Sequence, residues 1–489
     1  MESSATQVAA ELEGWLLRDM DPFPYFFLVA MEAGSLIRAI AVLLAFPIAW
    51  LLKNAGRHDA ALQLYVFVAC AGLREADVEA VGQAVLPRFL AEDLRLRAWK
   101  TFSLYTPSQR IVISSLPRAM LHSFVRLQLG AQQLLAPELL CTSSGRCLGV
   151  LKHFDQHRPR LGATYLPKEL LRPTPTHKYT GKLQAYANAL KQETSSEEPE
   201  MVSMEDLHRP VLFHDGRIAS RPTPAMALLM LLWMPLGFAL ALVRIVMCGQ
   251  APLRWWPLLA RMTGVRVVVE GKVQAAAAGT SSGAGLLLVC NHRTLMDPIF
   301  VAMALRRQVT AATYSVSRLS EALSPIETVR LERDAERDLK RLRDLVKSGR
   351  HLVVCPEGTT SREALLLRFS ALFAEVTDDI VPVAVDTTAT FFHGNSARGF
   401  KALDPFFFMM NPVPTYRLVF LGRLPPEMTC GAGGRTRVEV ANHVQRLIAS
   451  TLGFQCSCFT RPDKYRFLAG TDGTVCRTPS LRRHASSKI

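Results

Sequence analysis

Short apolar runs that end abruptly in polar loops recur through the second half of the chain. The run Leu286–Val289 predicts a buried strand, because it is only a few residues long and Gly283 and Gly285 precede it. Polar residues follow at once, and Pro298 then opens the apolar-periodic segment Ile299–Leu305. Proline at a first helical position is a helix-start signal, so the pattern predicts a strand, a tight polar loop and a helix.

The same kind of pattern surrounds this unit. Glu332–Gly349 carries apolar residues at helical spacing and predicts an amphipathic helix that Gly349 ends. Helix and strand signals that alternate in this way are typical of an α/β fold. Four further apolar runs predict strands: Val265–Val269, Leu352–Cys355, Val381–Val385 and Arg417–Leu421.

The clearest membrane candidate is Ala225–Cys248, because about 20 apolar residues are enough to span a bilayer. Its one charged residue, Arg244, stands near an end, where a long side chain is expected to reach the polar interface. Pro235 predicts either a kink or a helical hairpin that enters the membrane and returns. Trp255 and Trp256 follow, as expected for residues at the boundary between membrane and water.

Residues 26–52 are also largely apolar, but Glu32 and Arg38 interrupt them. The uninterrupted part, Ala39–Leu52, is shorter than a full span. We therefore expect only a weak membrane element here. It is either a re-entrant or interfacial helix, or a core helix of the N-terminal region.

The chain has 489 residues, of which 49% are hydrophobic and 20% charged, and is long enough for two domains with their own cores. Its net charge of +15 favours anionic partners such as phosphate-bearing substrates, acyl-CoA or an anionic membrane face. No recognised nucleic-acid-binding motif accompanies this charge, so nucleic acid is not an expected partner. The ten cysteines lack the paired spacing of zinc sites, and we expect free thiols on a reducing, cytosolic face.

His292 and Asp297 lie on the polar loop that follows the first predicted strand. A carboxylate that accepts from one imidazole nitrogen fixes the ring, so the other nitrogen can take a proton from a substrate. In α/β sheets, loops at the carboxyl ends of strands are where ligands gather. The simpler alternative is that His292 caps the strand and Asp297 caps the helix.

This loop is one of four short stretches that form a larger pattern. They are NHRTLMDP at 291–298, SPIETVRLER at 324–333, CPEGTTSRE at 355–363 and IVPVAVD at 380–386. Their residues and their order resemble the four sequence blocks of the glycerolipid acyltransferase superfamily. The resemblance favours a catalytic role for His292 and Asp297 over the capping alternative.

The N-terminal stretch ELEGWLL resembles the opening motif of the haloacid dehalogenase (HAD)-like region that plant glycerol-3-phosphate acyltransferases carry. Glu11 and Glu13 stand where that motif has aspartates, and Ser114 or Ser115 stands in place of the second phosphatase motif. An extra methylene displaces a nucleophilic carboxylate by roughly an ångström, which costs on the order of 100-fold in rate. The magnesium-binding loop is not recognisable between residues 143 and 206. We therefore expect a degenerate HAD-like scaffold without phosphatase activity.

The resemblance implies a plant-type, membrane-bound glycerol-3-phosphate acyltransferase of the sn-2 type. Such an enzyme transfers a fatty acyl group from acyl-CoA to glycerol 3-phosphate and gives lysophosphatidic acid for surface-polyester precursors. The implied catalytic residues are His292, as the base, and Asp297, which orients it; no cofactor, metal or acyl-enzyme is expected. The implied substrate-binding residues are Arg330, Arg333, Glu357, Gly358 and Thr359.

The expected fold is α/β in both parts: a HAD-like domain, then an acyltransferase domain with a central mixed sheet, attached to the membrane by an apolar helical segment. The expected location is the endoplasmic reticulum membrane, with the catalytic domain facing the cytosol. Two alternatives stay open: a bifunctional acyltransferase and phosphatase that gives monoacylglycerol, and a non-catalytic membrane scaffold. The expected divisions are the HAD-like domain at 1–160, a linker at 161–206, the membrane segment at 207–264, the acyltransferase domain at 265–470 and a basic tail at 471–489.

Overall fold

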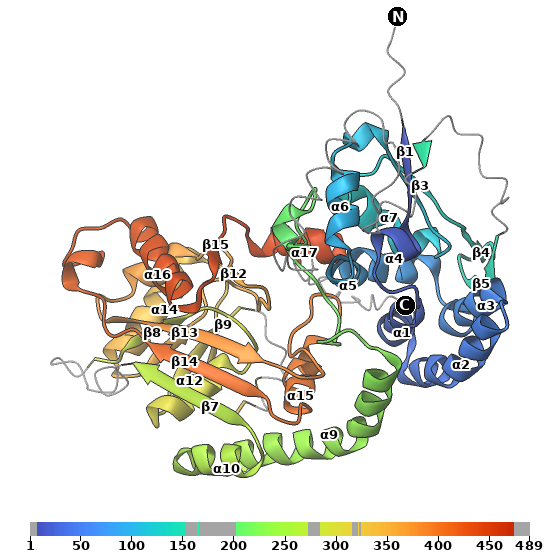
Figure 1. The fold of residues 1–489 in the computed structure, drawn as a ribbon. Helices are drawn as coiled ribbons and strands as arrows, with labels where there is room; N and C mark the ends of the chain where they lie inside the picture. Colours follow the sequence, from blue (N-terminus) through green and yellow to red (C-terminus); the bar gives the residue numbers. More distant parts are fainter. Residues whose placement is uncertain are drawn as a thin grey trace, which may run out of the picture.

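Two α/β units, each built on its own sheet, make up the described part of the chain (Figure 1). The structure is a computed structural model that describes residues 7–152, 164–165, 202–271, 284–314, 321 and 324–473. The predicted fold class, α/β with a mixed sheet in the second unit, is confirmed. Three predicted features lie wholly or largely outside the described residues: the linker at 161–206, the basic tail at 471–489 and the stretch 143–206, in which no magnesium-binding loop is recognisable from the sequence.

The N-terminal unit has a parallel sheet with the strand order β3-β2-β1-β6. Its strands are β1 (Val8–Glu11), β2 (Arg110–Ile113), β3 (Gln133–Leu135) and β6 (Thr164–Tyr165). A separate antiparallel hairpin pairs β4 (Leu139–Cys141) with β5 (Cys147–Leu151). The helices of this unit are α1 (Phe23–Val29), α2 (Leu36–Asn54), α3 (His58–Cys70), α4 (Glu75–Ala84), α5 (Leu86–Glu92), α6 (Leu96–Ser103) and α7 (Arg118–Leu127).

In the turn after β1, the side chain of Glu13 bonds to the residues that follow β2. The carboxylate of Glu13 accepts hydrogen bonds from the Ser114 hydroxyl and from the backbone N–H groups of Ser115 (3.3 Å) and Leu116 (3.4 Å). Burial raises the pKa of Glu13. Trp15 is buried next to it and packs edge-on against Phe102. The donors that follow β2 are therefore already occupied by a side chain of the protein.

The second unit has a seven-stranded sheet in the order β10-β9-β11-β8-β13-β14-β7. The first five strands in this order, β10, β9, β11, β8 and β13, run parallel to one another. Strand β14 is antiparallel to β13 and parallel to β7. The strands are β7 (Arg266–Gly271), β8 (Leu287–Cys290), β9 (Thr310–Thr313), β10 (Glu327–Arg330), β11 (Leu352–Val354), β13 (Ile380–Thr388) and β14 (Thr415–Phe420). A small parallel pair joins β12 (Leu365–Leu366) to β15 (Gln455–Cys456).

Helices cover both faces of this sheet (Figure 1). Successive side chains of a strand point to opposite faces, so Leu287 and Val289 of β8 join Leu342 in one core cluster. Leu288 of the same strand joins Val301 in the other cluster. The helices are α9 (Pro224–Gln250), α10 (Trp256–Met262), α12 (Asp297–Leu305), α14 (Ala335–Lys347), α15 (Asp404–Met409), α16 (Arg437–Leu452) and α17 (Arg461–Ala469).

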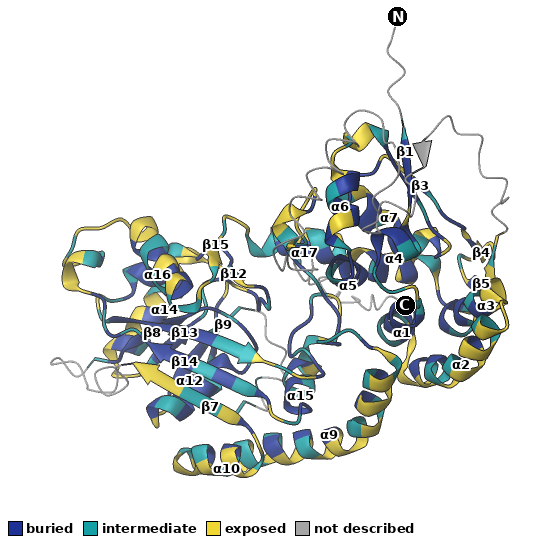
Figure 2. Cartoon of the chain, viewed as in Figure 1, coloured by how far each residue is buried: buried dark blue, intermediate teal, exposed yellow. Residues whose placement is uncertain are grey.

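Two helices of the described residues, α2 and α9, are long and apolar enough to cross a membrane by length and composition. Only 22% of the most apolar window of each helix is buried, and Figure 2 shows exposed residues along both. The sequence predicts a single strong membrane element and only a weak one near the N-terminus. Helix α2 is longer than the sequence predicts, because the two charged residues do not interrupt it. Glu32 lies in the turn before the helix, and the Arg38 side chain donates to the Val68 carbonyl at 3.1 Å.

Arg244 of α9 does not reach toward a polar interface, so that expectation is wrong. Its side chain is buried, and its guanidinium donates to the backbone carbonyls of Thr263 (2.5 Å), Met409 (2.5 Å), Asn411 (2.7 Å) and Pro412 (2.9 Å). A buried guanidinium needs such acceptors, because an unpaired charge in the interior is strongly unfavourable. One side of α9 is therefore fixed to the acyltransferase unit, and the other remains exposed and apolar.

The two units touch through the C-terminal helix α17, which lies between them (Figure 1). Gln83 of α4 donates to the Phe467 carbonyl at 3.0 Å. Nη1 of Arg88 in α5 lies 2.6 Å from Nε2 of His214, whose backbone N–H donates to Glu363 at 3.2 Å. The N-terminal unit therefore contacts the chain next to the third sequence block.

Candidate active site

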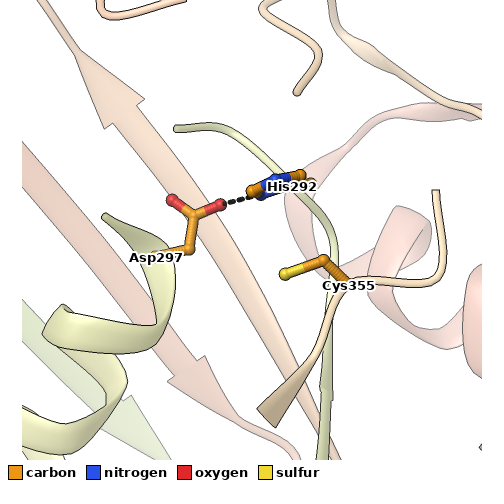
Figure 3. Close-up of side chains that lie close together, drawn as sticks. All are labelled: His292, Asp297 and Cys355. Carbon is orange, nitrogen blue, oxygen red and sulfur yellow. Dashed lines mark hydrogen bonds and ion pairs between the residues drawn. The ribbon is translucent and has the colours of Figure 1, made fainter. Parts of the chain in front are cut away.

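The loop between β8 and α12 brings His292 and Asp297 together (Figure 3). Asp297 is the first residue of α12, and Pro298 follows it in the first turn, as the sequence predicts. Nδ1 of the imidazole lies 2.9 Å from Oδ2 of Asp297. The Asp297 side chain is fully buried, whereas the His292 side chain retains 15% of its exposure. A buried acid thus holds a base that remains partly accessible.

The Asp297 carboxylate also organises the rest of the loop. Oδ2 accepts the backbone N–H groups of Arg293 (2.7 Å) and Thr294 (3.1 Å). Oδ1 accepts the Thr294 N–H (3.0 Å) and the hydroxyl of Tyr416 (3.2 Å), which belongs to the distant strand β14. These donors fix the orientation of the carboxylate, and through it the plane of the imidazole.

The environment of His292 favours its protonated form. Burial lowers the pKa of the imidazole, but the neighbouring Cys355 sulfur and the hydrogen bond and charge of Asp297 raise it, and the net result lies well above the usual value. In the neutral imidazole, with Nδ1 donating to Asp297, Nε2 has a lone pair that can accept a proton. The pair can therefore act as a general base whose protonated form is stabilised as it forms.

The thiol of Cys355 lies beside the pair (Figure 3). Its sulfur is 3.4 Å from that of Cys290, and this contact and burial raise the pKa of Cys355 well above its usual value. The thiol is therefore neutral near pH 7 and is a weak nucleophile. One donor atom each of His292, Asp297 and Cys355 lies within 4.8 Å of the others. These residue types also bind zinc, but both oxygens of Asp297 are already bonded within the loop.

The third sequence block supports His292 from the other side. Glu357 accepts the backbone N–H of His292 through Oε1 (2.8 Å) and that of Leu367 through Oε2 (3.0 Å). Burial raises the pKa of Glu357 to about 7, although these bonds and the charge of His292 act against the rise. The backbone N–H of Ser361 donates to the His292 carbonyl at 2.7 Å. Gly358 has φ +69° and open space where a Cβ would point, so glycine fits this turn without strain.

Asn291 and Arg293 hold the loop in place. The Asn291 amide exchanges two hydrogen bonds of 2.8 Å with the backbone of Val385 in β13. Nη1 of Arg293 donates to the carbonyls of Ser361 (3.1 Å) and Glu363 (2.7 Å). The first, third and fourth sequence blocks therefore meet around His292 through bonds that involve the backbone.

A cavity of about 710 Å³ lies next to the pair. His292 and Asp297 are not among the described residues that line it, but Cys355 is on its wall, and the Cys355 sulfur lies within 4.8 Å of a ring nitrogen of His292. Apolar side chains such as Leu342 and Phe369 line part of it. Its charged lining consists of the carboxylates of Asp338 and Glu357 and the guanidinium groups of Arg333, Arg368, Arg437 and Arg461.

The two arginines of the second block have different places. Arg333 lines the cavity and has φ +67°, a conformation that is uncommon outside glycine and that is found at functional sites. Asp338 holds this turn, because its carboxylate accepts the backbone N–H groups of Glu332 (2.8 Å) and Arg333 (3.0 Å). Arg330 is not among the described residues that line the cavity, and it pairs with Glu321 at 2.8 Å.

Two further residues of the third block turn away from the cavity. Thr359 is buried, and it is absent from the described lining of the large cavity. Arg362, the arginine of the same block, donates to the Asn395 side chain (2.7 Å) and to the Gly216 carbonyl (2.8 Å). These contacts make Arg362 a structural bridge rather than a residue facing the cavity.

Sequence patterns do not single out several residues of the site. Tyr416 is buried in β14, between Thr415 and Arg417, and the need of a buried hydroxyl for a hydrogen-bond partner is its only signal. Arg368 and Arg461 lie outside the four blocks and resemble ordinary surface arginines in the sequence. Their places on the cavity wall depend on the folded chain.

Comparisons with known proteins fit this geometry. The family profile described as "Glycerol-3-phosphate acyltransferase RAM2-like, HAD-like domain" matches residues 7–172, and an acyltransferase profile matches residues 266–386. The chain is similar to glycerol-3-phosphate acyltransferase RAM2 of Petunia hybrida, with 41% identity over 482 residues, 96% of this chain and 98% of that protein.

Two proteins of Arabidopsis thaliana are similar over most of their length. Glycerol-3-phosphate acyltransferase 1 is 40% identical over 494 residues, which cover 95% of this chain and 81% of that protein. Probable glycerol-3-phosphate acyltransferase 2 is 36% identical over 483 residues, which cover 95% of this chain and 89% of that protein.

Proposed function

Because the chain belongs to the RAM2-like family of glycerol-3-phosphate acyltransferases, we propose that it transfers a fatty acyl group from acyl-CoA to glycerol 3-phosphate. The products are lysophosphatidic acid and free CoA. The observation that carries the proposal is the 2.9 Å contact between His292 and Asp297 beside a cavity lined with arginines. A base and an anion-binding wall are what the acylation of a phosphorylated alcohol requires.

The proposed reaction proceeds in one covalent exchange. Nε2 of His292 takes the proton of the acceptor hydroxyl as its oxygen attacks the thioester carbonyl. The tetrahedral intermediate then releases the CoA thiolate, which receives the proton back from the imidazolium. Asp297 stabilises the imidazolium through the contact with Nδ1. The neutral thiol of Cys355 supports direct transfer rather than an acyl-enzyme, since the thiolate is the nucleophilic form.

The acceptor phosphate is proposed to bind Arg333. A guanidinium holds two phosphate oxygens with paired donors, and Arg333 is positioned on the cavity wall by a strained turn. Gly358 contributes backbone that leaves room for the substrate, and Glu357 acts through the position of His292. Arg330 and Thr359 act indirectly in this proposal, because the first pairs with Glu321 and the second lies behind the cavity wall.

We propose that the enzyme works on a membrane, where its acyl product is retained. The exposed apolar faces of α2 and α9 support this association. A location on the cytosolic side of the endoplasmic reticulum agrees with the nine described cysteines, which are all free thiols, since the cytosol is reducing.

The proposal is tested by incubating membranes that contain the chain with labelled glycerol 3-phosphate and a series of acyl-CoAs. We expect lysophosphatidic acid whose formation requires both substrates, with the acyl group on the middle hydroxyl. Monoacylglycerol as the main product would favour the bifunctional alternative. No acyl transfer with any acyl-CoA, from protein that is folded and in the membrane, would favour the scaffold alternative.

A further inference from the structure

The positive charge on the cavity wall exceeds what its own carboxylates can balance. In Asp338 and in Glu357, both carboxylate oxygens accept hydrogen bonds from backbone N–H groups. Within the described residues, Arg333, Arg368 and Arg461 form no ion pair with a carboxylate at 4.0 Å or less. Three arginines therefore line one cavity without a carboxylate in ion-pair contact among those residues, although the charges of Asp472 and Asp463 act on Arg461 and Arg368.

Arg461 is the most constrained of the three. Nη2 donates to the Gly473 carbonyl at 2.7 Å, and the guanidinium lies 5.3 Å from the centre of the Tyr465 ring. Its Nε is buried and has no hydrogen-bond partner among the described residues. Burial lowers the pKa of Arg461 and the positive charge of Arg333 lowers it further, whereas the negative charge of Asp472 acts in the opposite direction. Because the two guanidinium groups repel each other, an anion bound beside them would be stabilised by both.

The C-terminal helix that carries Arg461 is bonded to the third sequence block. Nζ of Lys464 donates to the Thr360 carbonyl at 2.8 Å. The backbone N–H of Arg368 donates to the Phe459 carbonyl, also at 2.8 Å. Arg461 therefore has a defined position relative to the third block, although it lies outside the residues matched by the acyltransferase profile.

We propose that Arg368 and Arg461 act with Arg333 to bind a phosphate group of a substrate, which makes the C-terminal helix α17 part of the binding site. This inference rests on the proposed function, because that function supplies two phosphate-bearing substrates. The phosphomonoester of glycerol 3-phosphate and the phosphates of acyl-CoA share the chemistry that such a cluster recognises. The planar, paired donors of the guanidinium suit either group.

The test measures KM for both substrates in Arg461→Ala and Arg368→Ala. Loss of a charged hydrogen-bond donor is expected to raise KM for the bound substrate about 10- to 100-fold. A rise for glycerol 3-phosphate assigns the cluster to the acceptor, and a rise for acyl-CoA assigns it to the donor. Arg461→Lys should recover part of the loss, because it restores the charge without the paired donors.

Arg466→Ala is the matched control, since this arginine is on the same helix, is exposed and pairs with Asp463 at 3.5 Å. Its KM values should equal those of the wild type. Binding of glycerol 3-phosphate and of CoA is also measured by calorimetry on purified His292→Ala, alone and combined with Arg461→Ala. This second arm does not depend on catalysis, so a failure of the proposed base and a failure of the binding cluster are distinguishable. The inference is overturned if Arg461→Ala and Arg368→Ala change neither KM nor either binding constant.

Discussion

At the scale of single residues, one carboxylate determines the geometry of the proposed reacting centre. Asp297 bonds to the imidazole of His292, to two backbone N–H groups and to the Tyr416 hydroxyl. An amide of the same shape could still accept through its oxygen, but its nitrogen would donate toward Nδ1 of His292. Asp297→Asn would therefore remove the charge that stabilises the imidazolium and also one of the two oxygens that accept backbone N–H groups of the loop.

Asp297→Asn should lower acyl transfer by about 100- to 10,000-fold, the range of general-base contributions. The pH profile gives a second readout, because only neutral His292 can accept a proton. The raised pKa of His292 places the acid limb of the wild-type rate above the ordinary value of 6.5, and loss of the Asp297 charge should move the limb to lower pH. Rates measured across pH for both proteins check this, and an unshifted limb would contradict the role of Asp297.

Cys355→Ser should retain most of the activity, because the neutral thiol is not expected to form an acyl-enzyme. Thiol alkylation should inactivate the wild type only slowly near pH 7, because little of Cys355 is thiolate, but an adduct formed there would block the cavity next to His292. The serine variant should resist the same reagent. Residual activity after alkylation measures both effects, and severe loss in the untreated Cys355→Ser protein would indicate a catalytic thiol instead.

At the scale of elements, α9 has two faces with different roles. Its buried face carries small residues such as Gly237 and Ala241 together with Arg244, and it lies along the acyltransferase unit. Its other face is exposed and apolar, including Leu232 and Leu236 (Figure 2). A helix fixed in this way can present its apolar face to lipid while the sheet stays outside the bilayer.

Arg244→Leu should separate these two roles. It removes the donor for four buried carbonyls, and each buried polar group left unsatisfied costs about 1–3 kcal/mol, so we expect a loss of about 3 kcal/mol or more in unfolding free energy. Association with membranes should persist in 1 M salt, where charges are screened beyond about 3 Å. Thermal unfolding in detergent and salt-washed membrane fractions check both effects.

Arg254→Leu is the control for this change, because Arg254 is exposed in the turn before α10. Its unfolding temperature should match that of the wild type. An unchanged unfolding temperature in Arg244→Leu would show that the four carbonyls are satisfied in another way.

The sequence predicts most strands of the acyltransferase sheet, including β7 at one edge, but misses β9 and β10 at the other end. Runs such as Leu286–Val289 are short, apolar and bounded by turn residues, and they become buried central strands. Strands β9 (TAAT) and β10 (ETVR) carry threonine, alanine and charged residues, and β10 is at the edge of the sheet. A half-exposed edge strand lacks the apolar pattern that identifies a buried one.

At the scale of the whole molecule, the N-terminal unit contributes contacts rather than a second active site. Its second motif binds the Glu13 carboxylate of the same unit. Arg88 meanwhile reaches across to His214, next to Glu363 of the third block. These contacts connect the unit to the third sequence block, and they support the prediction that the unit has a structural role.

The product of the enzyme should therefore keep its phosphate. Glu11→Asp combined with Glu13→Asp should not create phosphatase activity, because the shorter side chains restore two carboxylates without supplying a magnesium site or removing Trp15 from the core. Inorganic phosphate released from lysophosphatidic acid by the purified chain, with magnesium present, is the measurement. Release above background by either protein would refute this account of the N-terminal unit.

The sequence alone predicts the reacting pair but not the full cavity. His292 and Asp297 are close in the chain, so a local pattern is enough to place them together. Arg461 and Arg368 reach the cavity only through the packing of α17 on the third block. Such positions depend on long-range contacts, which no local pattern of apolar and polar residues contains.

The central claim is that His292 is the base of an acyl transfer to glycerol 3-phosphate, and one comparison tests it most directly. The rate of labelled lysophosphatidic acid formation is measured for the wild type and for His292→Ala at equal protein in the membrane. The account predicts a fall of about 100- to 10,000-fold, with expression and membrane association unchanged. Near-normal turnover by His292→Ala would contradict it.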